Sequence, residues 1–162
     1  MKRALLTCLI TFLCLNASAQ QQKEYIKTYF SNGKIKSEGW SIGETKTGYW
    51  IFYSPNGKIL SKGHYKNNIR EKYWYFYNQN GSLINEGHFS KNKKTGWWIF
   101  YNKGKLSHKS QYEGDELNGF SIWFKNDNPK KVEKYAHNKK INEWTDAKKF
   151  KEDNNIPDYL WQ

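Results

Sequence analysis

The sequence GYWIFY at residues 48–53 is followed by three related segments further along the chain. They are KYWYFY at residues 72–77, GWWIFY at 96–101 and, more loosely, GFSIWF at 119–124. The tryptophan position recurs in steps of 24, 24, 23 and 23 residues, at Trp50, Trp74, Trp98, Ser121 and Trp144. A near-constant period in this range is typical of repeat arrays, in which each unit is one supersecondary element. The chain is therefore predicted to be a tandem repeat protein.

Each unit is predicted to form two antiparallel strands. The first strand, such as residues 49–53, consists of aromatic and β-branched residues, which favour a pleated surface. An Asn-Gly pair such as Asn56-Gly57 follows, and such pairs supply the positive φ angles of tight hairpin turns. The second strand, such as residues 58–65, leads into a polar connector, Lys66-Asn67-Asn68. Short strands with regular turn signals between them predict an all-β meander of hairpins with a period of about 24 residues.

The end of the array departs from this pattern. Ser121 replaces the tryptophan, and no glycine follows Gly119. Terminal repeats are often atypical because they must close the array against water. Residues 144–162 are therefore predicted to form a short atypical cap, with Asp146 starting a helix over residues 147–152 that stops before Pro157.

The first residues have the layout of a secretory signal peptide. A basic head, Met1-Lys2-Arg3, precedes an uncharged apolar stretch at residues 4–15 and the small residues Ala17 and Ala19. Cleavage is predicted between Ala19 and Gln20, which gives a signal peptide at residues 1–19 and a repeat array at residues 20–143. An uncleaved anchor or a buried helix is the competing interpretation. The mature protein is expected outside the cytoplasm, in the periplasm, in the cell envelope or secreted.

The mature chain offers little for catalysis. Both cysteines, Cys8 and Cys14, lie in the signal peptide, so disulfides, thiolate metal sites and cysteine nucleophiles are excluded after cleavage. The chain contains no Gly-x-Ser-x-Gly, His-Glu-x-x-His or glycine-rich phosphate loop. His64 and His88 occupy equivalent positions in successive units, but two ligands do not make a closed metal site. We expect no enzyme activity, no metal and no cofactor.

The repeat unit resembles a known family. Written as Gly-aromatic-Trp-x-Phe-Tyr, then x-x-Asn-Gly-Lys, then x-x-x-x-Gly-x-Tyr, it is similar to the variant MORN repeat over roughly residues 25–144. Arrays of this repeat occur in bacterial proteins grouped as YwqK-like antitoxins. The resemblance implies antiparallel hairpins packed into an elongated twisted sheet, and a binding or scaffolding role without catalysis. An antitoxin against an intracellular toxin needs a cytoplasmic location, so the predicted export signal implies either a target outside the cytoplasm or a different role.

The charge of the chain bears on its partners. The net charge is +12, and it falls to +10 when Lys2 and Arg3 are removed with the signal peptide. Of the remaining basic residues, 24 are lysines and only Arg70 is an arginine. Proteins that read bases or clamp phosphates rely on arginine, so nucleic acid is a disfavoured partner. The favoured partner is another protein, with an antitoxin-like or inhibitory role; the alternative is adhesion to an acidic glycan or a membrane surface.

A column of tyrosines is the predicted interaction surface. Strand alternation places Trp50 on one face of the sheet and Tyr53 on the other. Tyr53 recurs as Tyr77 and Tyr101, and tyrosine is enriched at interfaces because it gives a large contact area for little entropy. The competing interpretation is that this column is buried between hairpins and that binding uses the lysine-rich connectors.

Overall fold

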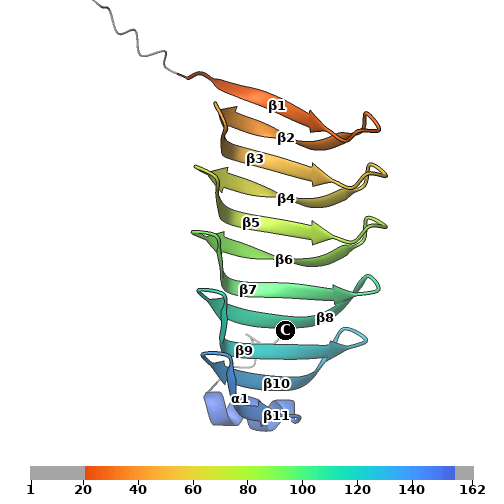
Figure 1. Cartoon of the computed structure of the whole chain (residues 1–162). Helices are drawn as coiled ribbons and strands as arrows, with labels where there is room; N and C mark the ends of the chain where they lie inside the picture. Colours follow the sequence, from red (N-terminus) through yellow and green to blue (C-terminus); the bar gives the residue numbers. More distant parts are fainter. Residues whose placement is uncertain (1–20, 156–162) are drawn as a thin grey trace, which may run out of the picture.

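The chain forms a single open sheet. The structure is a computed structural model that describes residues 21–155, and these residues form eleven antiparallel strands in sequential order followed by a short helix (Figure 1). The elements are β1 (Lys23–Tyr29), β2 (Ile35–Ile42), β3 (Thr45–Tyr53), β4 (Ile59–Lys66), β5 (Ile69–Tyr77), β6 (Leu83–Ser90), β7 (Lys93–Asn102), β8 (Lys105–Glu113), β9 (Glu116–Lys125), β10 (Asn128–Ala136), β11 (Lys139–Trp144) and α1 (Ala147–Asn154). The prediction of an all-β meander of tandem hairpins is confirmed. The predicted signal peptide, with its cleavage site, lies outside the described residues.

The strands extend further than the aromatic segments predict. Strand β3 already begins at Thr45, and the connector after β4 is a two-residue turn between Lys66 and Ile69. Asn67 and Asn68 in this turn have φ angles of 52° and 62°, in the left-handed region that asparagine tolerates. The polar residues beside each aromatic segment therefore pair within the sheet instead of forming a loose connector.

The Asn-Gly turns, which lie at the opposite ends of the strands, differ from the prediction in one respect. Gly57 has a φ of 87°, whereas Asn56 does not have a positive φ. The Asn56 side chain instead accepts a hydrogen bond from the Lys58 amide at 3.2 Å. It also donates to the Gln79 carbonyl in the next turn at 3.3 Å. Glycine alone supplies the positive φ here, and the asparagine links neighbouring turns.

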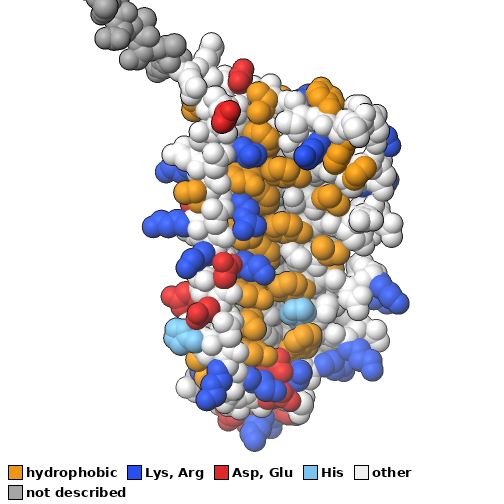
Figure 2. Space-filling model, viewed as in Figure 1, with side chains coloured by type: hydrophobic (Ala, Val, Ile, Leu, Met, Phe, Trp, Pro, Cys, Tyr) orange, Lys and Arg blue, Asp and Glu red, His pale blue; other side chains and the backbone are white. Residues whose placement is uncertain are grey.

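The core lies on one face of the sheet, which we call the tryptophan face because it carries Trp50, Trp74 and Trp98. These three residues are only 2%, 1% and 1% exposed, although no second layer formed by residues 21–155 covers them. They alternate with phenylalanines: Phe52 stacks on Trp74 at 6.4 Å between centroids, and Phe76 stacks on Trp98 at 6.0 Å. Figure 2 shows this face, with a continuous band of hydrophobic side chains running across the strands. Side-to-side stacking of the units therefore supplies the core.

Within the described part of the chain, the opposite face, called the tyrosine face, is covered only at its C-terminal end. There the helix α1 packs Phe150 against Trp144 and Phe120, with centroids 5.2 and 5.4 Å apart, and Val132 completes the cluster. Asp146 caps the helix, accepting a hydrogen bond from the Lys149 amide at 2.7 Å, so the predicted helix start is confirmed. Among residues 21–155, no helix has the length and apolarity needed to cross a bilayer.

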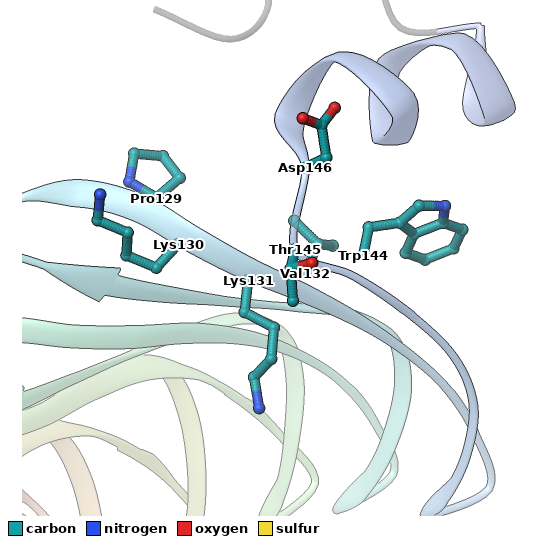
Figure 3. A pocket seen from close by; sticks show the side chains of 7 residues that line it. All are labelled: Pro129, Lys130, Lys131, Val132, Trp144, Thr145 and Asp146. Carbon is teal, nitrogen blue, oxygen red and sulfur yellow. The ribbon is translucent and has the colours of Figure 1, made fainter.

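The position of Trp144 corrects the sequence alignment of the repeats. In β5, Lys72 and Tyr73 bulge out between the paired residues Glu71 and Trp74, whereas in β11 only Ile141 bulges out. This one-residue difference turns Trp144 to the tyrosine face, because side chains alternate along a strand. Trp144 therefore does not continue the column of Trp50. Figure 3 shows the segment from Trp144 to Asp146 leading into α1 beside a small pocket, with Lys131 pointing away from the helix.

Candidate functional site

The predicted tyrosine column lies on the tyrosine face, and all three of its side chains are half-buried. Tyr53, Tyr77 and Tyr101 occupy equivalent positions on β3, β5 and β7. The Tyr53 hydroxyl donates to Glu38 Oε1 at 2.6 Å, and the Tyr101 hydroxyl donates to Glu86 Oε1 at 2.6 Å. Tyr53 and Tyr101 thus each bind a side chain of a second strand, and all three tyrosines remain partly exposed.

The hydroxyl groups of Tyr53 and Tyr101 are held as neutral donors by their carboxylate partners. Burial and the hydrogen bond to Glu38 raise the pKa of Tyr53 to about 12. Burial and the hydrogen bond to Glu86 raise the pKa of Tyr101 as well. The hydrogen bond from Tyr53 in turn lowers the pKa of Glu38, which also pairs with Lys27 at 3.3 Å. The Glu38 carboxylate is therefore charged at neutral pH.

A second feature of the tyrosine face is an unbroken row of directly paired residues, called the central row, that runs from β2 to β10. On β1 the row is flanked by Lys27, which pairs with Glu38. Charged residues lie on the even-numbered strands up to β8 and alternate in sign, and uncharged residues lie on the odd-numbered strands. In strand order the row consists of Glu38, Ile51, Lys62, Tyr75, Glu86, Ile99, Lys109, Ile122 and Val132.

Sequence reasoning missed the central row because it aligned aromatic residues only. The signal was present, since Glu38, Lys62, Glu86 and Lys109 follow one another at 24, 24 and 23 residues. Within the row, the Lys62 ammonium lies 5.2 Å from the Tyr75 ring centroid and 5.7 Å from that of Tyr77. Burial opposes the charged form of Lys62, but its interactions with Tyr77 and the neighbouring tyrosines outweigh burial and raise its pKa.

The tyrosine face also exposes large aromatic side chains. Tyr25, Trp40 and Trp97 are 47%, 39% and 38% exposed. His64 and His88 lie in the same region, each in edge contact with a tyrosine of the adjacent strand at about 5 Å. The two histidines are strand residues in aromatic contacts, and within residues 21–155 no three His, Cys, Asp or Glu side chains gather as a metal site.

The tryptophan face carries a different charge pattern. Lys46, Arg70 and Lys94 occupy equivalent positions on β3, β5 and β7, and each lies over aromatic rings. The distances to the ring centroids are 5.3 Å from Lys46 to Trp50, 4.0 Å from Arg70 to Phe89 and 4.9 Å from Lys94 to Trp98. A line of cations therefore covers the buried tryptophans.

Comparison with known proteins identifies the type of repeat in the first two hairpins. The family described as MORN repeat variant matches residues 26–39 and 46–67, which fall in the hairpins β1–β2 and β3–β4. A search of curated proteins finds no match. The following hairpins keep the same pairing, because Trp74 pairs with Gly63 and Trp98 with Gly87 just as Trp50 pairs with Gly39. The chain is therefore a repeat protein whose N-terminal hairpins match the MORN repeat variant.

Proposed function

We propose that this protein acts by binding another protein, with the tyrosine face as its contact surface. Repeats of the matched type are typical of binding proteins and generally not of enzymes. The observation that carries the proposal is that no described element covers the tyrosine face before β9, although that face presents aromatic rings along the whole array. Large exposed aromatic surfaces on soluble proteins mark interaction sites.

The chemistry of this face suits a protein partner. Tyrosine and tryptophan dominate the energetics of protein interfaces, and Tyr53, Tyr77 and Tyr101 line one side of the central row. The charged residues of the row add directional contacts that favour some partners and reject others. An aromatic surface with interspersed charges of both signs therefore fits a folded protein better than a uniformly charged polymer.

The proposed setting is outside the cytoplasm, which rests on the signal peptide predicted at residues 1–19. The partner is then an envelope or secreted protein, and the binding is antitoxin-like or inhibitory. N-terminal sequencing of the exported protein checks the setting. A chain that starts at Gln20 supports it, and a soluble cytoplasmic product that starts at Met1 or Lys2 contradicts it.

Site-specific cross-linking tests the contact surface. A photoreactive phenylalanine analogue at position 77 is expected to capture the partner, and the same analogue at position 94, on the tryptophan face, is not. Tyr53→Ala, Tyr77→Ala and Tyr101→Ala should each weaken binding of the captured protein by about 1–3 kcal/mol while the thermal midpoint moves little. If binding falls only because the variants unfold, the column is core and the assignment is wrong.

A second candidate, adhesion to an acidic glycan or an anionic membrane surface, is favoured by the cations of the tryptophan face. Lys46, Arg70 and Lys94 form a positive line over aromatic rings. Binding to heparin or to phosphatidylserine vesicles should then collapse as salt rises and should fall in Lys46→Gln and Lys94→Gln. Tyr53→Ala and Tyr77→Ala should leave this binding unchanged, which separates it from the first proposal.

A further inference from the structure

We propose that the partner of the tyrosine face is a second copy of this chain, packed face to face with its strands in the reverse order. The inference rests on the proposed function, because it takes the tyrosine face as the contact surface. A two-fold axis parallel to the strands and passing over β5 relates the copies. Such an axis places β2 of one copy over β8 of the other and β4 over β6, and the interface is isologous.

The central row is complementary to itself under this axis. Glu38 faces Lys109 of the second copy, and Lys62 faces Glu86 of the second copy. Symmetry repeats both contacts, so all four charges of the row meet an opposite charge. Between them, Ile51 faces Ile99 of the second copy, and the two copies of Tyr75 meet on the axis. A single row thus supplies alternating ion pairs and apolar contacts.

Among the contacts of the central row, the alternation of charge favours this register. An axis over β4 would place Glu38 against Glu86 and bring the two copies of Lys62 together. An axis over β6 would place Lys62 against Lys109 and bring the two copies of Glu86 together. Half-buried like charges in contact are strongly unfavourable. Axes over β3 or β7 avoid this repulsion but engage fewer of the charges.

The tyrosine column fits the same arrangement. Because the axis is parallel to the strands, residues stay at the same height, so Tyr53 faces Tyr101 of the second copy and the copies of Tyr77 meet each other. On the other side of the central row, His64 faces His88 of the second copy. The rows that flank the central charges are therefore aromatic, as expected for the apolar part of an interface.

The shape of the array permits this packing. The axes of the antiparallel strands stay nearly parallel from one end of the sheet to the other, so two such sheets can pack face to face (Figure 1). The helix α1 packs against β10 and β11. With β1 of one copy over β9 of the other, the β1 edge meets the opposite α1, because Phe150 of the helix contacts Phe120 of β9. The charge contacts of the central row lie between β2 and β8, away from the helix.

The tryptophan face does not fit a second copy. The same axis would bring Lys46 against Lys94 and Arg70 against Arg70, and the chain as a whole carries a net charge of +12. In the central row the two positive and two negative charges cancel, and the flanking Lys27 is paired with Glu38 of its own copy, so repulsion between copies is lower there. Charge therefore directs self-association to the tyrosine face.

Charge reversal tests the inference. The purified wild-type protein is expected to be a dimer by sedimentation equilibrium. Lys62→Glu and Glu86→Lys each create like-charge contacts at two symmetric positions and should weaken dimerisation by about tenfold or more. Mixed in equal amounts, the two variants again present opposite charges at both positions, so a one-to-one heterodimer should appear in native mass spectrometry when one variant is isotope-labelled. Lys94→Glu on the tryptophan face is the matched control and should leave the dimer intact.

Circular dichroism keeps folding apart from association. Glu86→Lys could disturb the sheet, because Tyr101 loses its hydrogen-bond partner. In that case Lys109→Glu is the variant to use, since it should weaken the dimer through the contact with Glu38 of the second copy. A wild-type protein that is monomeric at about 1 mM overturns the inference, as does a dimer that ignores the charge reversals or variants that fail to form the heterodimer. A monomer that still cross-links a different protein through position 77 overturns self-association and leaves the proposed function standing.

Discussion

Trp74 lies flat against the backbone of Gly63, so close that a Cβ atom at residue 63 would overlap the indole ring. The indole nitrogen of Trp74 donates to the His64 carbonyl at 3.2 Å, which fixes the ring in this position. The same relationship recurs between Trp98 and Gly87. A glycine on one strand therefore makes the space in which the tryptophan of the next strand is buried, and this is how a single sheet builds a core.

Substitution of these glycines by alanine should destabilise the fold through overpacking. Neither Gly63 nor Gly87 has a positive φ, so the effect of Gly63→Ala or Gly87→Ala is steric. We expect each to lower the free energy of unfolding by about 1–3 kcal/mol, measured by urea denaturation.

The equivalent position in the fourth unit supplies the control. There Ser110 replaces the glycine and faces Ser121 in place of a tryptophan, with the two hydroxyls 2.7 Å apart. Ser110→Ala loses only this hydrogen bond and should cost about 1 kcal/mol. Gly63→Ala as stable as the wild type would show that the indole can move aside, and that the close approach is not required.

Much of this fold could be predicted from the sequence, because the aromatic columns and turn glycines repeat at a visible period. The hairpins and their order followed from that spacing, and the helix start followed from Asp146 as a capping residue. The face of Trp144 did not, since it depends on whether one or two residues bulge out of β11, and both choices leave the spacing of tryptophans intact. Repeat spacing thus predicts topology better than it predicts which face a terminal residue occupies.

Asn92 links the two hairpins on either side of it. Its amide donates to the Arg70 carbonyl at 3.1 Å, and its Oδ1 accepts from the Arg70 amide at 2.7 Å, so the residue acts as an extra rung of the sheet. It also has a φ of 67°. The same pair of hydrogen bonds recurs at Asn68, Asp115 and Asn138.

The contributions of the Asn92 side-chain hydrogen bond and of its left-handed backbone can be separated by mutation. Asn92→Gly keeps the backbone conformation but loses the side-chain acceptor, and should cost about 1 kcal/mol. Asn92→Ala loses both and should cost about 1 kcal/mol more. Asn92→Asp reproduces the residue found at position 115 and should be close to neutral. Equal unfolding free energies for the alanine and glycine variants would contradict the role of the left-handed backbone.

Lys72 lies at a position where the other units have glycine. Its φ is 61°, and the equivalent Gly48 and Gly96 both have a φ of 65°. Because a left-handed conformation is strained for a residue with a Cβ, Lys72→Gly should raise the free energy of unfolding by about 1 kcal/mol.

The reverse change at Gly96 is the matched control. A Cβ at residue 96 would meet no atom within 4 Å, so Gly96→Ala tests backbone strain without a steric clash. It should lower stability by about 1 kcal/mol. Thermal denaturation of both variants measures the effect of the backbone strain on stability. If Lys72→Gly is less stable than the wild type, the lysine side chain stabilises the fold by more than the strain destabilises it.

The candidate site was predictable only in part. Tyr53, Tyr77 and Tyr101 share a column in both the sequence and the structure, because they belong to the best-conserved part of the repeat unit within this chain. The central row was not seen, since Glu38 and Lys62 differ in chemical type and only the paired strands reveal that their side chains point the same way. Glu133 was also missed, because it occupies the place of Gly39, Gly63 and Gly87 and breaks the pattern.

Glu133 should make the free energy of unfolding depend on pH in the acidic range. The residue is 5% exposed, and its carboxylate accepts hydrogen bonds from Trp123 Nε1 at 2.6 Å, Lys131 Nζ at 2.9 Å and the Tyr135 hydroxyl at 3.1 Å. Burial alone would raise the pKa of this carboxyl, but the hydrogen bonds from Lys131, Trp123 and Tyr135 outweigh burial and lower the pKa to about 2.

A folded-state pKa below the unfolded value stabilises the protein above the unfolded pKa, and this stabilisation is lost as the pH falls. Glu133→Gln should therefore be less stable than the wild type by up to about 3 kcal/mol at pH 7. The difference should shrink between about pH 5 and pH 2, as the wild type takes up the proton. Urea denaturation at several pH values measures the difference, with Glu24→Gln on the exposed part of β1 as the control for a change in net charge. A difference for Glu133→Gln that stays constant across this range would mean that the carboxylate is not held in its charged form by Lys131 and Trp123.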